Sequence, residues 1–161
     1  MYSPGSPEEV IRCYQDLVYR VAFAYCKNPA DAEDITQEVF VRYLKHRKGF
    51  NDEEHLKSWL VRVTANASKS LLRSAWFRKT APLSGHENLH AEFESAQNGV
   101  YTAVMALPEK YRAVVLLYYF EGYAAGEIAK MLRRTETAVQ TQLQRARAML
   151  KKKLKEDWEN E

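Results

Sequence analysis

The sequence predicts an all-α protein made of two small helical domains joined by a flexible linker. Apolar residues recur at steps of three and four through most of the chain, which is the period of an amphipathic helix. No segment shows the apolar and polar alternation of a half-buried strand. A polar segment at residues 79–98, broken by Pro82 and Gly85, interrupts the helical pattern. We therefore expect a first domain at residues 1–78 and a second at residues 99–161.

The overall charge permits binding to nucleic acid but does not require it. The 161 residues are 46% hydrophobic, which is enough for ordinary cores, and the formal net charge is +3. Attraction to DNA must therefore come from local clusters of cations rather than from the whole surface.

The cysteines and the lengths of the apolar runs bear on the cellular location of the protein. Cys13 and Cys26 form no CxxC pair, so we expect neither a disulfide framework nor a zinc finger. No apolar run approaches the roughly 20 residues that span a bilayer, and the first residues lack the basic and apolar parts of a signal peptide. We expect a cytoplasmic protein with no membrane insertion.

Three helices are expected in the first domain, packed as a three-helix bundle. The first, at about residues 7–26, begins with a capping serine, a proline and two acids. The second begins with a similar pattern and covers about residues 29–46. An irregular, exposed loop at residues 48–55 follows it, and a third helix covers about residues 56–77.

The second expected helix has an acidic outward face. Its members recur at steps of three and four and are Asp31, Asp34, Gln37 and Glu38. Acids early in a helix stabilise it through the helix dipole, which is sufficient to explain Asp31. Asp34 and Glu38 lie beyond the first turn, where that benefit fades, and their carboxylates suit a basic partner protein.

The third expected helix carries a stripe of cations and one amide. Its members follow one another at steps of four, three and four and are Arg62, Asn66, Lys69 and Arg73. Cations bind phosphates and asparagine reads base edges, so this stripe suits a nucleic-acid strand. The alternative is the ordinary solvated face of a bundle helix.

Four helices are expected in the second domain, and the last two form a helix-turn-helix. Helical spacing returns at Gly99, Pro108 opens the next helix and Gly122 ends it. The segment at residues 128–154 reads as two helices around a short polar turn. Thr135 is placed to cap the second of these two helices.

The outward side of the last helix suits the major groove of DNA. Polar side chains with paired donors and acceptors read base edges, and cations meet phosphates. The candidate contacts are Arg134, Thr135, Glu136, Thr137, Gln140, Thr141, Gln144 and Arg145. The alternative is a packing helix whose lysine-rich end suits its own dipole.

His86, Glu87 and His90 spell H-E-x-x-H, the sequence pattern of zinc peptidases. A working site needs a buried helix and a third ligand, whereas this pattern follows a glycine inside the polar segment. We therefore interpret it as a coincidence, and we expect no metal, no cofactor and no enzymatic activity. Metal analysis of the purified protein would test this expectation.

The order of these segments closely resembles bacterial sigma factors of the extracytoplasmic-function group. The resemblance rests on NPADAEDITQEVFVRY at residues 28–43, SWLVRVTANASKSLLR at residues 58–73, and the series LPEKYR, YFEG, EIA and RAR within residues 107–150. It implies that the first domain is sigma region 2, which binds core RNA polymerase and recognises and melts the minus-ten promoter element. The second domain is then region 4, which reads the minus-thirty-five element.

The resemblance also implies roles for single residues. In that family the face matching Asp34, Gln37 and Glu38 binds the clamp helices of the polymerase largest subunit, and region 4 docks on the flap. The loop that holds Phe50 and Asn51, together with the helix that bears Asn66, captures a base flipped from the minus-ten element. An anti-sigma protein commonly restrains such a factor.

Three features depart from the family pattern, and one alternative function is compatible with the helices. Glutamines occupy the recognition helix where cations are common, Ala124 replaces a capping serine or threonine, and Arg133 lies where glycine is usual. The alternative is a stand-alone helix-turn-helix repressor or activator with an unrelated N-terminal bundle. Such a protein would bind duplex operator DNA tightly without polymerase.

Overall fold

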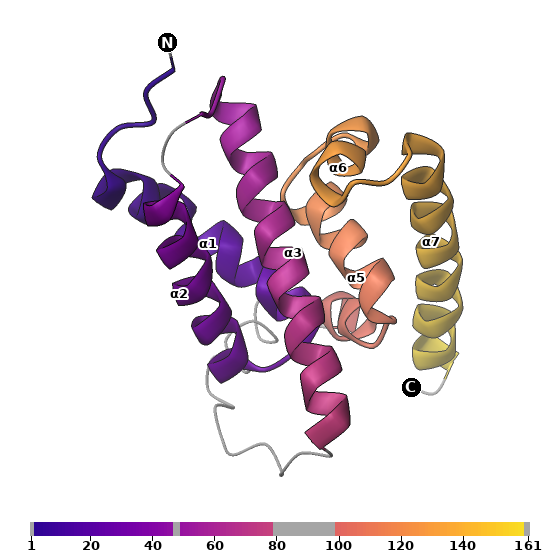
Figure 1. The fold of residues 1–161 in the computed structure, drawn as a ribbon. Coiled ribbons are helices and arrows are strands. Elements are labelled where there is room, and N and C mark those ends of the chain that lie inside the picture. The colour runs from indigo at the N-terminus through magenta and orange to yellow at the C-terminus, as the bar shows by residue number, and fades with distance from the viewer. Residues whose placement is uncertain (1, 47–48, 79–98, 160–161) are drawn as a thin grey trace.

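The computed structural model describes residues 2–46, 49–78 and 99–159, and all regular structure within these ranges is helical (Figure 1). This confirms the all-α prediction. Residues 99–105 are helical, and the other elements, in chain order, are α1 (Pro7–Cys26), α2 (Pro29–Lys45), α3 (Glu53–Arg78), α5 (Glu109–Val115), the π-helical turn η1 (Leu116–Phe120), α6 (Ala125–Leu132) and α7 (Glu136–Glu159). Within the described ranges, no helix combines the length and apolar character required to cross a membrane.

Side-chain caps fix where the first three helices begin. The Ser6 hydroxyl accepts a hydrogen bond from the Glu9 N–H, and the Glu9 carboxylate accepts one from the Ser6 N–H. Asn28 caps α2 by accepting from the Asp31 N–H at 3.1 Å. Asp52 caps α3 in the same way, which is why α3 begins at Glu53, three residues earlier than the apolar pattern predicts.

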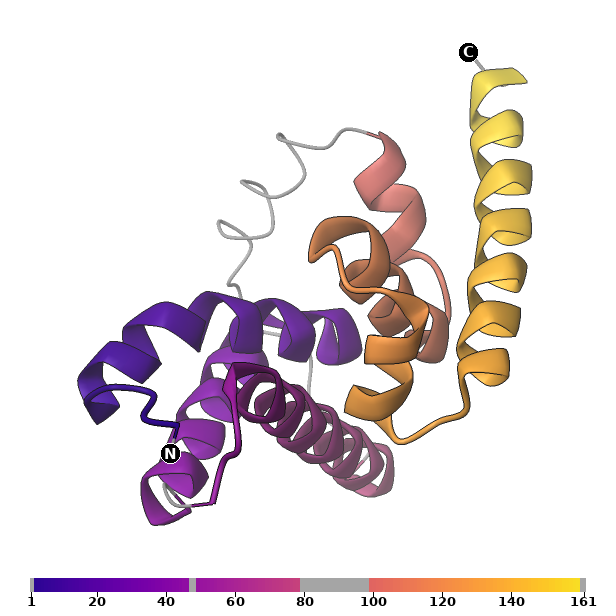
Figure 2. The same ribbon diagram turned by 90° about the horizontal axis from the view of Figure 1, so that it is seen from above.

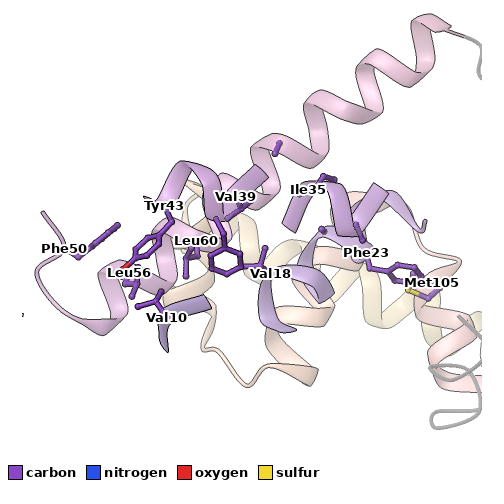
Figure 3. Packing of buried hydrophobic residues seen from close by; sticks show 14 of the residues in the cluster. Val10, Val18, Phe23, Ile35, Val39, Tyr43, Phe50, Leu56, Leu60 and Met105 are labelled. Atoms are coloured by element: carbon purple, nitrogen blue, oxygen red, sulfur yellow. The ribbon is translucent and has the colours of Figure 1, made fainter. Parts of the chain in front are cut away.

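Helices α1, α2 and α3 pack around one apolar core. Figure 3 shows Val18, Val39 and Leu60 pointing toward one another from these three helices. Leu44 does not join this core: its side chain is 44% exposed on the outer surface of α2, whereas the helical period predicts an inward position. The reason is that α1 and α3 cover only one side of α2, and Leu44 lies beyond the edge of that side.

The remaining helices form a second unit around the helix-turn-helix. Ile128 of α6 and Val139 and Leu143 of α7 are buried together. Gly122, with φ of +78°, turns the chain after η1 as the sequence predicts, because glycine adopts positive φ without steric cost.

The two units pack directly against each other, so that the molecule has a closed arrangement (Figure 2). Helix α3 lies along α6, and α1 lies along α5. A single buried cluster includes Val21 and Tyr25 of α1, Val61 of α3, Leu117 of η1 and Ile128 of α6. The two predicted units therefore share part of their apolar core.

Candidate protein-binding and nucleic-acid-binding surfaces

Helix α2 presents the acidic face that its spacing predicts. Asp34, Gln37 and Glu38 are exposed, whereas Asp31 is half-buried near the start of the helix. Burial and the nearby Asp34 carboxylate raise the pKa of Asp31 above its ordinary value. Glu38 is paired with Arg42 at 2.6 Å, one turn further along, so that part of its charge is already balanced within the helix.

An apolar groove that the sequence analysis missed lies beside this acidic face. It runs between α1 and α2 and is lined by Ile11, Gln15, Thr36, Gln37, Phe40, Val41 and Leu44. Val41 is 49% exposed and Leu44 is 44% exposed, and both follow Gln37 at steps of four and three on one side of α2. The position of these two apolar residues on the same side of α2 as Gln37 was the sequence feature that could have indicated the groove. The acidic and apolar surfaces therefore adjoin through Gln37.

The stripe on α3 contains two half-buried side chains, Arg62 and Lys69, and two exposed ones. The Arg62 guanidinium donates to the Lys130 carbonyl of α6 at 3.1 Å. Lys69 lies over the Tyr25 ring, with its Nζ 5.9 Å from the ring centroid. Asn66 and Arg73 are exposed.

Burial at this junction weakens the charged state of both half-buried side chains. The pKa of Arg62 is lowered by burial and then by the nearby Arg133. The pKa of Lys69 is lowered by burial and by Arg134, with Glu109 acting in the opposite direction. Four cations from α3 and the α6–α7 turn are thus brought close together, which opposes closure of the two units.

The loop before α3 is fixed by aromatic packing and by a histidine. The Phe50 side chain is only 7% exposed, and its ring makes edge contacts with the rings of His46, His55 and Trp59. Asn51 is exposed, and its main-chain N–H donates to Nδ1 of His55 at 3.1 Å. Phe50 therefore supports the loop from inside, while Asn51 is accessible from solvent.

Helix geometry separates the two asparagines expected to contact DNA. Asn51 lies just before the start of α3, whereas Asn66 lies well along the helix. At 1.5 Å per residue, the distance along the helix axis between them is about 20 Å. They cannot both enclose one flipped base.

The helix-turn-helix has the local structure that the sequence predicts. The Thr135 hydroxyl accepts from the Ala138 N–H at 3.0 Å and so caps α7. Arg133 ends α6 in the left-handed conformation with φ of 54°, and Ala124 opens α6 with its N–H donating to the Glu127 carboxylate at 3.0 Å. Arginine thus occupies a conformation that favours glycine.

Most candidate base-reading side chains of the helix-turn-helix face solvent. The exposed members are Thr135, Glu136, Thr137, Gln140, Gln144 and Arg145. Thr141 is half-buried, and Arg134 is half-buried with its guanidinium donating to the Gln142 side chain at 2.6 Å. This face is open in the same arrangement that covers part of α3.

Two polar contacts that the sequence analysis missed connect the two units. The buried guanidinium of Arg112 in α5 donates to the carbonyls of Ala24, Tyr25 and Leu107, at 2.5, 2.8 and 2.7 Å. Ala24 and Tyr25 lie in the last turn of α1, where carbonyls lack partners within the helix. The sequence feature that could have indicated this contact is an arginine within the apolar run of α5.

The second contact is a bidentate ion pair. Nε and Nη2 of Arg20 in α1 lie 2.5 and 3.1 Å from the two carboxylate oxygens of Glu121, which follows η1. The hydrogen bond that Arg20 donates to Glu121 raises the pKa of Arg20, against the opposing effect of burial. The ion pair and Arg112 both border an apolar cavity of about 230 Å³ between the two units.

The H-E-x-x-H pattern at His86, Glu87 and His90 lies outside the described residues. Among the residues that are described, no group of three or more His, Cys, Asp or Glu side chains is arranged to hold a metal ion.

Comparison with known families identifies two regions in one order. The family model for Sigma-70 region 2 matches residues 10–78, and the family model for Sigma-70, region 4, matches residues 97–150.

Individual relatives match over most of the chain. It is 26% identical to the ECF RNA polymerase sigma factor SigW of Bacillus subtilis, over 92% of this chain and 88% of that protein. It is 30% identical to the ECF RNA polymerase sigma factor SigM of Mycobacterium tuberculosis, over 89% of this chain and 74% of that protein. The sigma factor RpoE of Bartonella quintana, solved with the anti-sigma factor NepR, shares the fold with a TM-score of 0.72 and 18% identity, over 92% of this chain and 96% of that chain.

Proposed function

The chain belongs to the sigma-70 family, in its extracytoplasmic-function group, and from this membership we propose that it binds core RNA polymerase and directs promoter-specific initiation of transcription. The observation that carries the proposal is the presence of region 2 and region 4 in the family order on one chain. The family consists of initiation factors rather than catalysts. We assign region 2 to residues 1–78, a connecting segment to residues 79–98 and region 4 to residues 99–161.

Helix α2 is the proposed binding surface for core polymerase. Its exposed acids Asp34 and Glu38 suit basic side chains on the clamp helices of the largest subunit, and Asp31 extends the face toward the start of the helix. The adjoining groove with Val41 and Leu44 supplies apolar area, which a lasting protein interface needs at its centre. Region 4 is proposed to dock on the flap.

Helix α3 and the loop before it are proposed to hold the melted minus-ten strand. Opening DNA without ATP requires the protein to bind the unpaired strand more tightly than the duplex. Exposed Asn51 and Asn66 are available to read bases, while Arg62, Lys69 and Arg73 meet phosphates. Because about 20 Å separates the two asparagines, we assign them to different nucleotides of the strand.

Helix α7 is proposed to read the minus-thirty-five element as duplex. Gln140 and Gln144 face solvent one helical turn apart, and each carries a donor and an acceptor suited to adenine in the major groove. Arg145 lies beside them for phosphate contact.

The closed arrangement supports a further part of the proposal, namely that the chain opens when it engages promoter DNA. The Arg62 guanidinium is bound to the Lys130 carbonyl of region 4, so the strand cannot reach the whole of α3 until the two units separate. An anti-sigma protein is the proposed restraining partner, and RpoE of B. quintana was solved in complex with the anti-sigma factor NepR. The proposed location is the cytoplasm, where the polymerase works.

Transcription in vitro tests the proposal directly. Purified core polymerase, with and without this chain, is presented with a library of promoter sequences, and the start sites are read by sequencing. We expect the chain to co-elute with core polymerase and to select a subset of promoters with shared minus-ten and minus-thirty-five sequences.

Two outcomes would contradict the proposal. Core polymerase that neither retains the chain nor changes its start sites would remove the sigma function. Tight binding to duplex DNA in the absence of polymerase would instead favour a stand-alone helix-turn-helix repressor or activator.

A further inference from the structure

We propose that His55 is a positioning residue for minus-ten recognition, and that protonation of its imidazole releases Asn51 and weakens capture of the strand. The inference rests on the proposed function, since it concerns the loop assigned to the melted strand. It is carried by the hydrogen bonds and ring contacts around the start of α3.

The first observation is a capping arrangement in which histidine replaces the usual glutamate or glutamine. Asp52 accepts a hydrogen bond from the main-chain N–H of His55 at 2.7 Å, which makes Asp52 the cap and His55 the third residue of the helix. In an ordinary capping box the side chain at that third position accepts from the main-chain N–H of the cap residue itself. Here Nδ1 of His55 reaches back and accepts from the Asn51 N–H at 3.1 Å.

The same chain contains the ordinary version at the start of α1. Glu9 is the third helical residue there, and its carboxylate accepts from the Ser6 N–H at 3.3 Å. A glutamate keeps its acceptor oxygens through the neutral range and well into acid. Both helix starts therefore use the side chain of the third helical residue to accept from a main-chain N–H before the helix. Glu9 reaches the cap residue Ser6, whereas His55 reaches Asn51, one residue before the cap Asp52.

The chemistry of imidazole makes the loop contact conditional. Nδ1 accepts a hydrogen bond only when it carries no proton, so the contact with the Asn51 N–H requires a neutral ring with its proton on Nε2. The imidazolium has two N–H donors and no acceptor, and it cannot hold the Asn51 N–H. Histidine is the side chain that ordinarily changes charge near neutral pH, so acid is a suitable means of testing this contact.

Carboxylates near the start of α3 could bind a protonated His55. Asp52, Glu53 and Glu54 provide three carboxylates in the first turn of α3 and its cap, and Tyr14 of α1 donates to Glu53 at 2.9 Å. Among the described residues, the other titratable groups around this turn include Tyr2, Tyr43, His46, Lys57 and Tyr123. A protonated His55 is thus attracted to the carboxylates at the same step that removes its bond to Asn51.

Ring packing transmits the change to the rest of the loop. The His55 ring meets the edge of Phe50, with 5.3 Å between ring centroids, and Phe50 in turn contacts Trp59 and His46. His46 stacks on Trp59 with 5.4 Å between centroids and 5° between planes. His46 is therefore the matched control, since it is a second imidazole in the same cluster, placed at the end of α2 rather than at the start of α3.

The test measures promoter opening by holoenzyme as a function of pH. Core polymerase carrying the full chain is mixed with a promoter selected in the library experiment, with 2-aminopurine in the minus-ten strand. We expect opening to fall about fivefold between pH 7.5 and pH 5.8 with the native chain, which corresponds to loss of one hydrogen bond.

Two variants separate the proposed role from a purely structural one. His55→Gln supplies a neutral amide acceptor at every pH, so its opening should lose most of the fivefold pH dependence relative to native holoenzyme. His46→Gln removes the other imidazole and should retain the native pH dependence. Binding to duplex minus-thirty-five DNA at each pH corrects for effects of acid on the polymerase itself.

The tautomer of the His55 imidazole can also be measured directly. In ¹⁵N-edited NMR of the full chain at pH 7.5, His55 should show the tautomer protonated on Nε2. The tautomer protonated on Nδ1 would overturn the inference, as would a pH dependence in His55→Gln equal to that of the native chain. A chain that never co-elutes with polymerase and opens no promoter at any pH would instead overturn the proposed function.

Discussion

Arg112 has three main-chain carbonyls as hydrogen-bond partners, and it is buried because those partners replace water. Two of the carbonyls belong to the last turn of α1, so one side chain of region 4 completes a helix end of region 2. Burial lowers the pKa of this guanidinium, with Glu109 and Cys26 acting in the opposite direction. The charge remains because arginine is not deprotonated in proteins.

Replacement of Arg112 by alanine should destabilise the closed protein by about 2–3 kcal/mol, because it leaves buried carbonyls unpaired. Urea denaturation of the native and variant chains measures this difference. The control is Arg12→Ala, which removes an exposed arginine from α1 and should change the free energy of unfolding by less than about 0.5 kcal/mol. Equal stability of Arg112→Ala and the native chain would show that these contacts do not hold the two units together.

At the scale of whole elements, the beginnings of α1, α2 and α7 were predictable because their capping signals are local, whereas the Asp52 cap of α3 was missed. Ser6, Asn28 and Thr135 each cap a helix within three residues, and the structure contains all three bonds. The exposure of Leu44 was not predictable from its helical period, because the period identifies a face without saying how much of it a neighbour covers. Most candidate side chains of α2 and α7 face outward as expected, but Asp31 and Thr141 are half-buried.

Charge reversal on α2 should separate polymerase binding from folding. We expect Asp34→Lys combined with Glu38→Lys to weaken binding to core polymerase about tenfold, because both carboxylates are exposed and suited to a basic partner. Binding is measured by fluorescence anisotropy of labelled chain, and folding by circular dichroism. Glu156→Lys, an exposed acid near the end of α7, is the control and should bind normally. Native affinity in the double variant would exclude this face from the interface.

Alanine at Gln140 and Gln144 should relax sequence preference at the minus-thirty-five element. Each bidentate glutamine contact contributes about 1–3 kcal/mol of discrimination between bases, whereas general attraction to DNA depends on cations. Arg145→Ala should show the opposite pattern, with uniformly weaker binding and a retained preference. Selection of duplex sequences from a random pool by each holoenzyme measures both effects. An unaltered preference in the double alanine variant would assign base reading to other residues.

For the molecule as a whole, the closed arrangement was the feature furthest from sequence reasoning. The patterns of α1, α3, α5 and α6 each identify an apolar face, but periodicity does not say which face meets which. Residues such as Val61 and Leu117 are buried inside their own unit and also pack against the other unit. Arg62 illustrates the result, since a side chain expected on a DNA-binding surface is bound to the Lys130 carbonyl.

The Arg20–Glu121 pair offers a reversible test of closure. Arg20→Glu should raise the ratio of open to closed molecules about fivefold, which corresponds to about 1 kcal/mol. The expected effect is small because Arg20 is partly exposed to solvent. Exchange of the two residues, as Arg20→Glu with Glu121→Arg, should restore closure. The distance between fluorophores on α2 and α7, measured by energy transfer, reports the two states. Identical transfer in the native, single and exchanged chains would show that the pair has no influence on closure.

The shared core also limits how long an open molecule persists on its own. Val21, Tyr25 and Leu117 are buried in one cluster while the units are together, and separation brings part of that cluster into water. Contiguous exposed apolar area promotes self-association and attracts chaperones and proteases. A chain released from the transcription complex must therefore refold onto itself or find another surface quickly, which ties its cellular lifetime to its occupancy on the enzyme.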